Sequence, residues 1–250
     1  MKIILSPAKK MIADTDNIAP VELPAFIDKT AEILGWMKSK SKEELKAIWK
    51  CNDKIAEQNF NRLETMDLYN RLTPAVLAYE GIAFQYMAPA VFEIQQFEYL
   101  QNHLRILSAF YGILKPLDGV TPYRLEMQAK AEIEETTNLY DYWGDRLYHS
   151  VIDDSRIIIN LASKEYSKCI EKYLTPQDRY ISVTFCEASG DKMVTKGTYA
   201  KMARGEMVRF MAENNIENPL DIKKFDRLGY SFRSDLSSET EYVFERKIKQ

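Results

Sequence analysis

Histidine, cysteine and glycine are scarce in this sequence, which has two, three and nine of them among 250 residues. No CxxC, HExxH or ExxH spacing occurs, so we expect no zinc site and no histidine-rich iron centre. This absence leaves open a metal site built from carboxylates alone. The glycines form no GxGxxG or GxxxxGK pattern, so the standard loops that bind the phosphates of dinucleotides and nucleoside triphosphates are missing. We therefore predict no metal and no cofactor.

Long apolar runs and an excess of one charge are also missing. No apolar run reaches the length of about 18 residues that a membrane helix needs, and the apolar stretch at the N-terminus is too short for a signal peptide. The cysteines are odd in number and widely spaced, which suits reduced thiols, so we predict a cytoplasmic protein with no membrane partner. The formal net charge is −3. Any nucleic-acid binding must therefore come from a local basic patch.

Hydrophobic residues make up 46% of the chain, which is enough for a well-packed core. Their periodicity predicts a buried N-terminal strand, a mainly helical first half and a strand-rich second half. Ser41 and Glu44 form a capping box at the start of one helix. The expected elements are strands over 2–7, 156–162 and 180–187, helices within 25–72, 74–81, 163–174 and 197–213, and a hairpin within 229–247. We predict a single compact α+β domain over residues 1–250, with a mixed sheet and surrounding helices.

The segment His103–Gly119 has the form of a helix-hairpin-helix element. Its apolar residues recur at helical spacing, at Leu104, Leu107 and Phe110. In such an element, backbone N–H groups of the hairpin and of the following helix hold a DNA phosphate. We predict that Gly112 permits close approach of the phosphate and that Lys115 adds an ion pair. An ordinary pair of core helices joined by a turn is the alternative.

The expected helix over 197–213 carries a second candidate phosphate site. At about 100° per residue, Lys201, Arg204 and Arg209 lie within roughly two-fifths of its circumference, and Gly205 among them is expected to leave backbone exposed for close approach of a ligand. Lys192 and Lys196 precede the helix, so five cationic residues and one anionic residue fall within 192–210. We predict a phosphate-binding surface here, with a solvated helix face as the alternative.

Several polar residues form a candidate pocket. Arg124 and Glu126 alternate with apolar neighbours, which indicates an ion pair or a grip on a polar substrate. The others lie at the ends of two expected strands, where the active sites of mixed sheets commonly occur. They are Ser6, Lys9, Asn160 and Ser163. Ordinary turns and a helix cap are the alternative for these four.

Five long motifs occur together in the order SPAK (6–9), LRILSAFYGILKPLDGVTPYRLEM (104–127), LYDYWGDRL (139–147), INLASKEY (159–166) and YAKMARGEMVRF (199–210). In this order they resemble the YaaA family of bacterial peroxide-stress proteins, and the resemblance extends to the closing GYSF and YVFER segments. It implies an α+β fold with a positively charged cleft and a helix-hairpin-helix, whose hairpin falls here on 111–115. It also implies binding of double-stranded and branched DNA, protection of that DNA from iron and peroxide, and a basic helix that contains Lys201, Arg204 and Arg209. No metal ligand and no catalytic residue follows from it.

Two functions are consistent with these residues. The first is a DNA-binding oxidative-stress protein that contacts backbone phosphates and has a role in iron homeostasis, which we favour over an enzyme. The alternative is an enzyme that acts on a nucleotide, nucleobase or nucleic acid, with Glu126 as acid or base and Arg124 or Lys201 holding the anion. Convergence of the polar residues in one closed pocket too narrow for a duplex favours chemistry or binding of a nucleotide-like small molecule, whereas cations along an open groove favour DNA.

Overall fold

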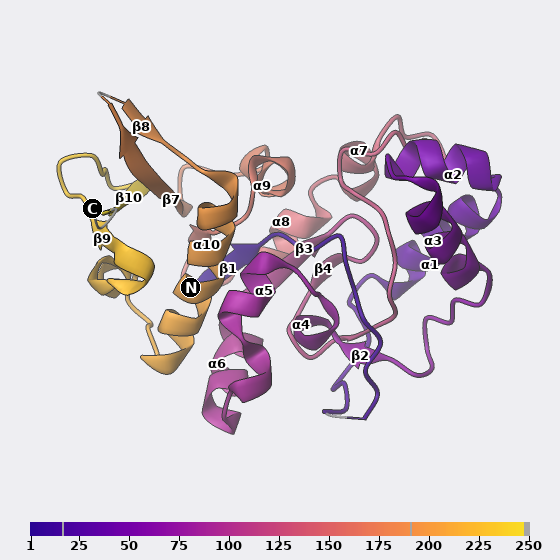
Figure 1. Cartoon of the computed structure of the whole chain (residues 1–250), viewed down its shortest axis with the longest axis horizontal. Helices are drawn as coiled ribbons and strands as arrows, with labels where there is room; N and C mark the ends of the chain where they lie inside the picture. The colour runs from indigo at the N-terminus through magenta and orange to yellow at the C-terminus, as the bar shows by residue number, and fades with distance from the viewer. Residues whose placement is uncertain (17, 191, 248–250) are drawn as a thin grey trace.

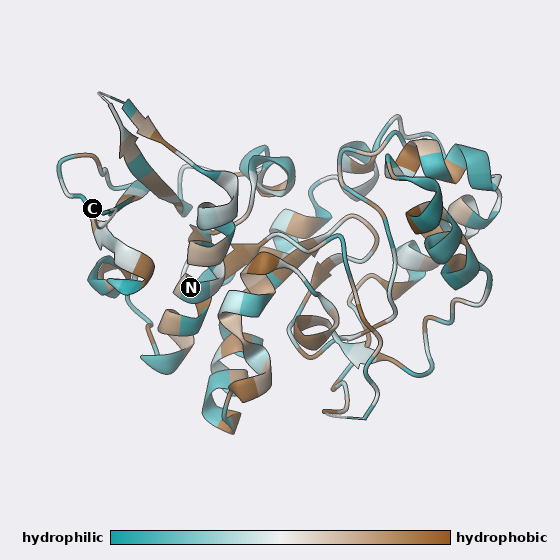
Figure 2. Cartoon of the chain, in the orientation of Figure 1, coloured by the Kyte–Doolittle hydropathy of each residue, from teal (hydrophilic) through white to brown (hydrophobic). Residues whose placement is uncertain are grey.

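The N-terminal strand lies in the middle of the sheet, between strands from two later parts of the chain. The computed structural model describes residues 1–16, 18–190 and 192–247. Strand β1 (Lys2–Leu5) runs parallel to β3 (Leu104–Ser108) on one side and to β6 (Ile157–Asn160) on the other. The three strands are almost completely buried, as Figure 2 reflects in their mostly brown colour. Burial on both faces explains why their sequences are nearly continuous apolar runs.

Within the described residues the main sheet has eight strands in the order β4-β3-β1-β6-β7-β10-β9, and β8 pairs with β7. The middle five strands are parallel, and β4, β8 and β9 are antiparallel to their neighbours. The remaining strands are β4 (Gly112–Leu114), β7 (Arg179–Ser189), β8 (Lys192–Val194), β9 (Tyr230–Phe232) and β10 (Glu241–Arg246), with β2 (Thr73–Pro74) and β5 (Gly119–Val120) in a separate pair.

Helices surround this mixed sheet. Figure 1 shows α5, α6 and α10 in front of the central strands, while α1, α2 and α3 gather beyond the β4 edge. The α-helices are α1 (Ile27–Lys38), α2 (Lys42–Trp49), α3 (Asp53–Glu64), α4 (Ala75–Ala78), α5 (Ile82–Met87), α6 (Ile94–His103), α7 (Leu139–Trp143), α8 (Arg146–Val151), α9 (Lys164–Glu171) and α10 (Gly197–Glu213). None of the described helices is long and apolar enough to cross a membrane.

The predicted α+β class and most of the predicted elements are confirmed. The N-terminal strand joins the sheet of the second half, and the helix over 197–213 has the expected bounds. Ser41 accepts from the Glu44 backbone N–H while the Glu44 carboxylate accepts from the Ser41 N–H, which is the predicted capping box. The C-terminal hairpin forms between β9 and β10.

The predicted helix-hairpin-helix is wrong. Residues 104–114 form the antiparallel strands β3 and β4, joined by a tight turn. Within that turn the Ser108 hydroxyl accepts from the backbone N–H groups of Phe110 and Tyr111. A strand buried on both faces lacks the polar–apolar alternation that distinguishes it from a helix, and the spacing of its leucines therefore misleads. Hairpin amides that already have protein partners offer no phosphate cradle.

Candidate functional site

The carboxyl ends of β1 and β6 meet at a change of direction in the sheet. After β1, the chain continues to β3, which pairs with β1 on the side away from β6. After β6, it continues to β7, which pairs with β6 on the side away from β1. In sheets with a parallel core, the crevice between two such strands is where ligands commonly bind. Ser6 follows β1 and Ser163 follows β6, and the two are bonded to each other. The Ser6 hydroxyl donates to Ser163 Oγ (3.1 Å) and accepts from the Ser163 backbone N–H (2.7 Å).

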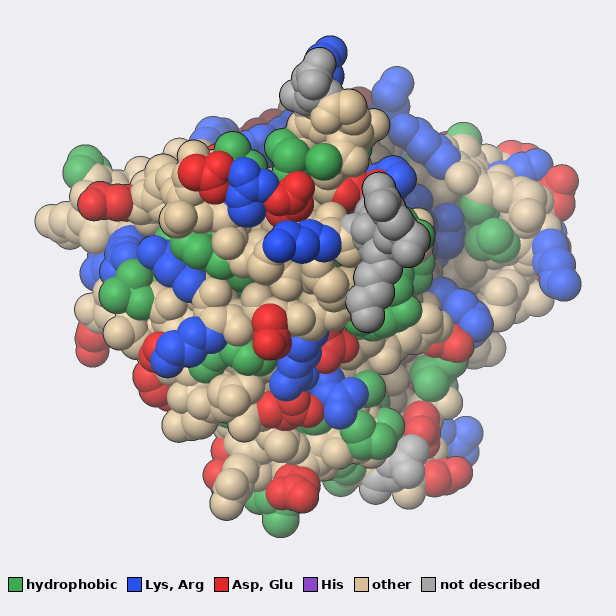
Figure 3. Space-filling model, turned by 60° about the vertical axis from the view of Figure 1, so that its left-hand side comes forward, with side chains coloured by type: hydrophobic (Ala, Val, Ile, Leu, Met, Phe, Trp, Pro, Cys, Tyr) green, Lys and Arg blue, Asp and Glu red, His purple; other side chains and the backbone are tan. Residues whose placement is uncertain are grey.

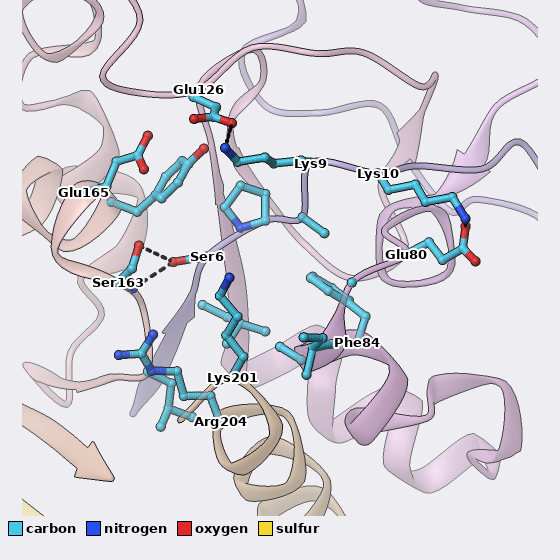
Figure 4. A pocket seen from close by; sticks show the side chains of 18 of the residues that line it. Ser6, Lys9, Lys10, Glu80, Phe84, Glu126, Ser163, Glu165, Lys201 and Arg204 are labelled. Carbon is cyan, nitrogen blue, oxygen red and sulfur yellow. Dashed lines mark hydrogen bonds and ion pairs between the residues drawn. The ribbon is translucent and has the colours of Figure 1, made fainter. Parts of the chain in front are cut away.

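A pocket of about 390 Å³ opens over these two serines. This volume suits a small molecule or one nucleotide, and it is far too small for a duplex. Segments from five parts of the chain form its walls, and Figure 4 shows their polar side chains. The polar lining comprises Ser6, Lys9, Lys10, Glu80, Glu126, Ser163, Glu165, Tyr166, Lys201 and Arg204. Strand β1, helices α5, α9 and α10 and the segment after β5 therefore all contribute.

Two cations at one end of the pocket have no anionic partner. Lys201 and Arg204 extend from α10, and Figure 4 shows the Lys201 side chain pointing toward Ser6. Within the described residues neither side chain makes an ion pair or a hydrogen bond, and Arg204 Nε is fully buried. Burial lowers the pKa of the Arg204 guanidinium from its usual value. Such a group is costly unless an anion neutralises it, so this end is suited to a phosphate or carboxylate.

The opposite end carries acidic side chains. Lys9 Nζ lies 2.5 Å from Glu126 Oε1, and Glu165 Oε1 accepts from the Gln128 backbone N–H at 3.3 Å. Burial raises the pKa of Glu165; the hydrogen bond from the Gln128 N–H opposes this rise, and the nearby charge of Glu126 adds to it. At the rim, Lys10 pairs with Glu80 at 2.8 Å. The pocket is therefore cationic at the α10 end and mixed in charge elsewhere.

The structure brings together four of the six residues predicted for the polar pocket, namely Ser6, Lys9, Glu126 and Ser163. Arg124 lies outside and approaches the Trp49 carbonyl at 3.5 Å, so the predicted ion pair between Arg124 and Glu126 is wrong. Asn160 also lies outside, where its side-chain oxygen accepts from the Ala162 backbone N–H in an ordinary turn.

Of the seven residues predicted to contact DNA, only Lys201 and Arg204 line the pocket. Lys196 pairs with the buried carboxylate of Glu187, and Arg209 pairs with Glu213 at 2.7 Å. Lys192 is exposed on β8, away from the pocket. On the face of the molecule drawn in Figure 3, basic and acidic side chains are interspersed, in keeping with these ion pairs.

The surroundings of Gly112, Lys115 and Gly205 differ from those that the sequence-based interpretation expected. Gly112 is buried, and a Cβ there would lie 2.7 Å from the Trp143 ring. Lys115 Nζ is 2.6 Å from Glu22 Oε1. Gly205 is covered by α5 and exposes no backbone for a ligand. DNA contact by Gly112 and Lys115 stays a prediction that has lost its supporting motif.

Sequence reasoning missed Glu165, Tyr166, Lys10 and Glu80. The first two had a detectable signal, because a helix that starts directly after a strand end presents its first turn at the same edge of the sheet. The other two had none. Lys10 is far in sequence from Glu80, and the backbone bridge between Met11 and Tyr79, with the Glu80 N–H donating to the Lys10 carbonyl at 2.9 Å, brings them together. Within the described residues, no group of three or more histidine, cysteine or acidic side chains is arranged to hold a metal.

Replacing Arg204 with Met is expected to stabilise the protein without ligand. Methionine fills a similar volume and removes a half-buried guanidinium whose buried Nε has no partner, which is worth about 1–3 kcal/mol. We expect the melting temperature to rise by roughly 2–4 °C per kcal/mol. Thermal unfolding of both proteins in low-phosphate buffer checks this, with Arg209→Met as the control. That variant breaks an ion pair and should not be more stable. An Arg204→Met protein that melts below the wild type would contradict an unpartnered arginine.

The fold and the pocket define a protein class: an α+β protein with a polar pocket at the switch point of a mixed sheet. The chain belongs to the family described as peroxide stress protein YaaA, whose profile matches residues 1–236. It is 84% identical over 248 residues to a UPF0246 protein of Agathobacter rectalis, covering 99% of this chain and 100% of that protein. A UPF0246 protein of Lachnoclostridium phytofermentans is 54% identical over 244 residues, covering 98% and 96%. The family resemblance predicted from the motifs is confirmed.

Proposed function

We propose that this peroxide-stress family member binds double-stranded and branched DNA in the cytoplasm and protects it from iron- and peroxide-driven damage. The observation that supports this most is the pair Lys201 and Arg204, two cations without an acidic partner among the described residues. They lie beside the Ser6 and Ser163 hydroxyls, which are suitable hydrogen-bonding groups for a phosphate. One backbone phosphate at this end of the pocket anchors the strand, and contacts outside the pocket hold the rest of the duplex.

The protection follows from occupancy and needs no redox chemistry of the protein. A bound strand has its phosphates paired with lysine and arginine, so it releases the cations that otherwise condense on it. Iron(II) is one such cation, and displacing it moves the source of peroxide-derived radicals away from the DNA. Backbone contacts of this kind carry little sequence information, so we expect weak sequence selectivity.

Removing the pocket cations is expected to weaken DNA binding and its dependence on salt. In Lys201→Ala/Arg204→Gln, the contact to the one phosphate held by both side chains is lost, so the slope of log K against log[salt] should become shallower by about 0.9. Affinity near 100 mM salt should fall by roughly tenfold or more, because charge-assisted hydrogen bonds are also lost. Fluorescence anisotropy with a labelled duplex and a four-way junction, across a salt series, measures both quantities.

The matched control is Lys196→Ala/Arg209→Gln, which removes the same charge from the same region. Both of its cations are already neutralised, by Glu187 and Glu213, and those carboxylates keep Arg246 and Arg227 as partners. Its slope and affinity should therefore match the wild type. An equal loss in the two double variants would mean that only net charge matters, and no binding by the wild type would end the DNA proposal.

A second candidate is an enzyme that acts on a nucleotide, nucleobase or nucleic acid. The observation that favours it is the convergence of Ser6, Lys9, Glu126 and Ser163 in a pocket of about 390 Å³, which is too narrow for a duplex and is therefore the arrangement expected for chemistry or small-molecule binding. Incubation of the protein with single-stranded and duplex oligonucleotides, followed by mass spectrometry of the products, tests it. A product that disappears in Glu126→Gln would support chemistry, and unchanged oligonucleotides would support binding alone.

A further inference from the structure

The two ends of the pocket differ in chemistry, and one ligand class matches both. The α10 end offers the cations Lys201 and Arg204. The far end offers Glu126, Glu165 and the ammonium of Lys9, and the pocket lining also includes the apolar side chains of Phe84 and Leu125. Figure 4 shows the acidic end and the cationic end on opposite sides of Ser6. A ligand that fills this space carries an anion at one end and a polar edge at the other.

A nucleotide has both an anionic end and a polar edge. Its phosphate matches the lysine and arginine, and its planar base matches an apolar wall. The pocket volume of about 390 Å³ lies within the range for small-molecule sites and admits one nucleotide. Proteins that take a single nucleotide out of a strand read its Watson–Crick edge with side chains in such a pocket.

The far end of the pocket selects among the bases. Carboxylates accept hydrogen bonds and an ammonium donates them, so two acidic side chains and one lysine suit an edge with one acceptor and adjacent N–H donors. Guanine has this edge, with O6 as acceptor and N1–H and N2–H as donors. Thymine has two acceptors that flank one donor, and its second carbonyl oxygen would face a carboxylate. Cytosine and adenine each lack the second donor group.

We propose that the pocket binds one guanine nucleotide, with the phosphate on Lys201 and Arg204 and the base edge on Glu126, Glu165 and Lys9. This rests on the proposed function, because it names what the phosphate end of the same site holds. The nucleotide has two sources with the same chemistry, a free guanine nucleotide and an unpaired or extruded guanine of a DNA strand. The test therefore has one arm for each source.

In the first arm, isothermal titration calorimetry compares dGMP with dTMP. We expect dGMP to bind at least tenfold more tightly, since a correct carboxylate or lysine contact to a base edge discriminates by that order. In Glu126→Gln/Glu165→Gln the preference should disappear, because dGMP loses its carboxylate acceptors while dTMP binds no more weakly than to the wild type: the phosphate end is intact and a glutamine amide can donate to its second carbonyl oxygen. Glu171→Gln is the matched control. It removes a carboxylate of the same helix, α9, that lies outside the pocket and is paired with Lys164 at 2.5 Å, so the preference for dGMP should remain.

In the second arm, anisotropy compares a paired duplex with duplexes that carry a single bulged G or a single bulged T. Tighter binding of the G bulge, lost in the double variant, assigns the site to a nucleotide of DNA. Preference for dGMP without preference for the G bulge assigns it to the free nucleotide. Thermal melting of each variant confirms folding.

The two proposals fail in different ways. If the paired duplex binds but dGMP and dTMP bind equally or not at all, the guanine site is wrong and DNA binding stands. If dGMP binds selectively and no DNA binds, the DNA proposal is wrong and the pocket is a site for free guanine nucleotides. An unchanged preference in Glu126→Gln/Glu165→Gln also overturns the assignment of the base end.

Discussion

Gly205→Ala is expected to destabilise the protein by about 4 kcal/mol or more. A Cβ at this position would lie 1.8 Å from the Ala83 carbonyl oxygen and 2.7 Å from its carbonyl carbon, and both are backbone atoms of α5. No rotamer change relieves a clash with backbone, so α5 and α10 must move apart. Overpacking usually costs about 1–3 kcal/mol, and this contact is shorter than side-chain rearrangement can accommodate. The gain in helix propensity from alanine, about 1 kcal/mol, is too small to offset it.

Chemical denaturation measures this loss, and Gly35→Ala is the matched control. Gly35 is also in a helix, α1, but nothing lies within 4 Å of the Cβ that would be added. It should gain about 0.5–1 kcal/mol from the lower entropy of the unfolded chain. A loss below 1 kcal/mol for Gly205→Ala would show that α5 and α10 do not depend on direct backbone contact. The two helices also form walls of the pocket, so weaker binding of dGMP should accompany the loss of stability.

The contrast between Gly35 and Gly205 shows how much of the structure can be predicted from the sequence. Both are glycines in correctly predicted helices, and intrinsic propensity treats them alike. Only the position of Ala83, more than a hundred residues earlier in the chain, distinguishes them. Gly205, which the sequence predicts to be an exposed position of the basic helix, instead allows α10 to pack directly against the backbone of α5. The helix itself was predictable because its apolar stripe has a regular period and a long span.

In the candidate site, too, local sequence patterns predicted some features, and long-range packing decided the others. Ser6 and Ser163 were predictable as neighbours in space, because both follow strands whose carboxyl ends were expected at one edge of the sheet. The charges were not predictable in the same way. In the sequence, the four basic residues Lys196, Lys201, Arg204 and Arg209 are equivalent. In the structure, Glu187 pairs with Lys196 and Glu213 pairs with Arg209, so Lys201 and Arg204 are the two that remain without an acidic partner. Local patterns predict where side chains emerge, and long-range packing determines which of them are neutralised.

Trp143→Ala is expected to cost about 3–5 kcal/mol, the range for truncating a buried large aromatic side chain. Trp143 is fully buried, contacts Phe26 and Tyr142 with its ring, and donates from Nε1 to the Ala109 carbonyl at 2.9 Å. Its removal leaves a cavity and a buried carbonyl without its partner. Chemical denaturation gives the free energy of unfolding. Trp143→Phe, which keeps an aromatic ring but not the donor, should lose less.

Trp143 also explains why residue 112 is glycine. A Cβ at 112 would lie 2.7–2.9 Å from three atoms of the Trp143 ring, and φ there is +73°. Gly112→Ala therefore combines a clash with left-handed backbone strain of about 1–2 kcal/mol. In the Trp143→Ala background the clash is absent, so Gly112→Ala should cost only the strain. A double-mutant cycle measures this coupling. Strictly additive losses would mean that the ring does not restrict residue 112, whereas strong coupling assigns Gly112 to packing inside the protein and not to contact with a phosphate.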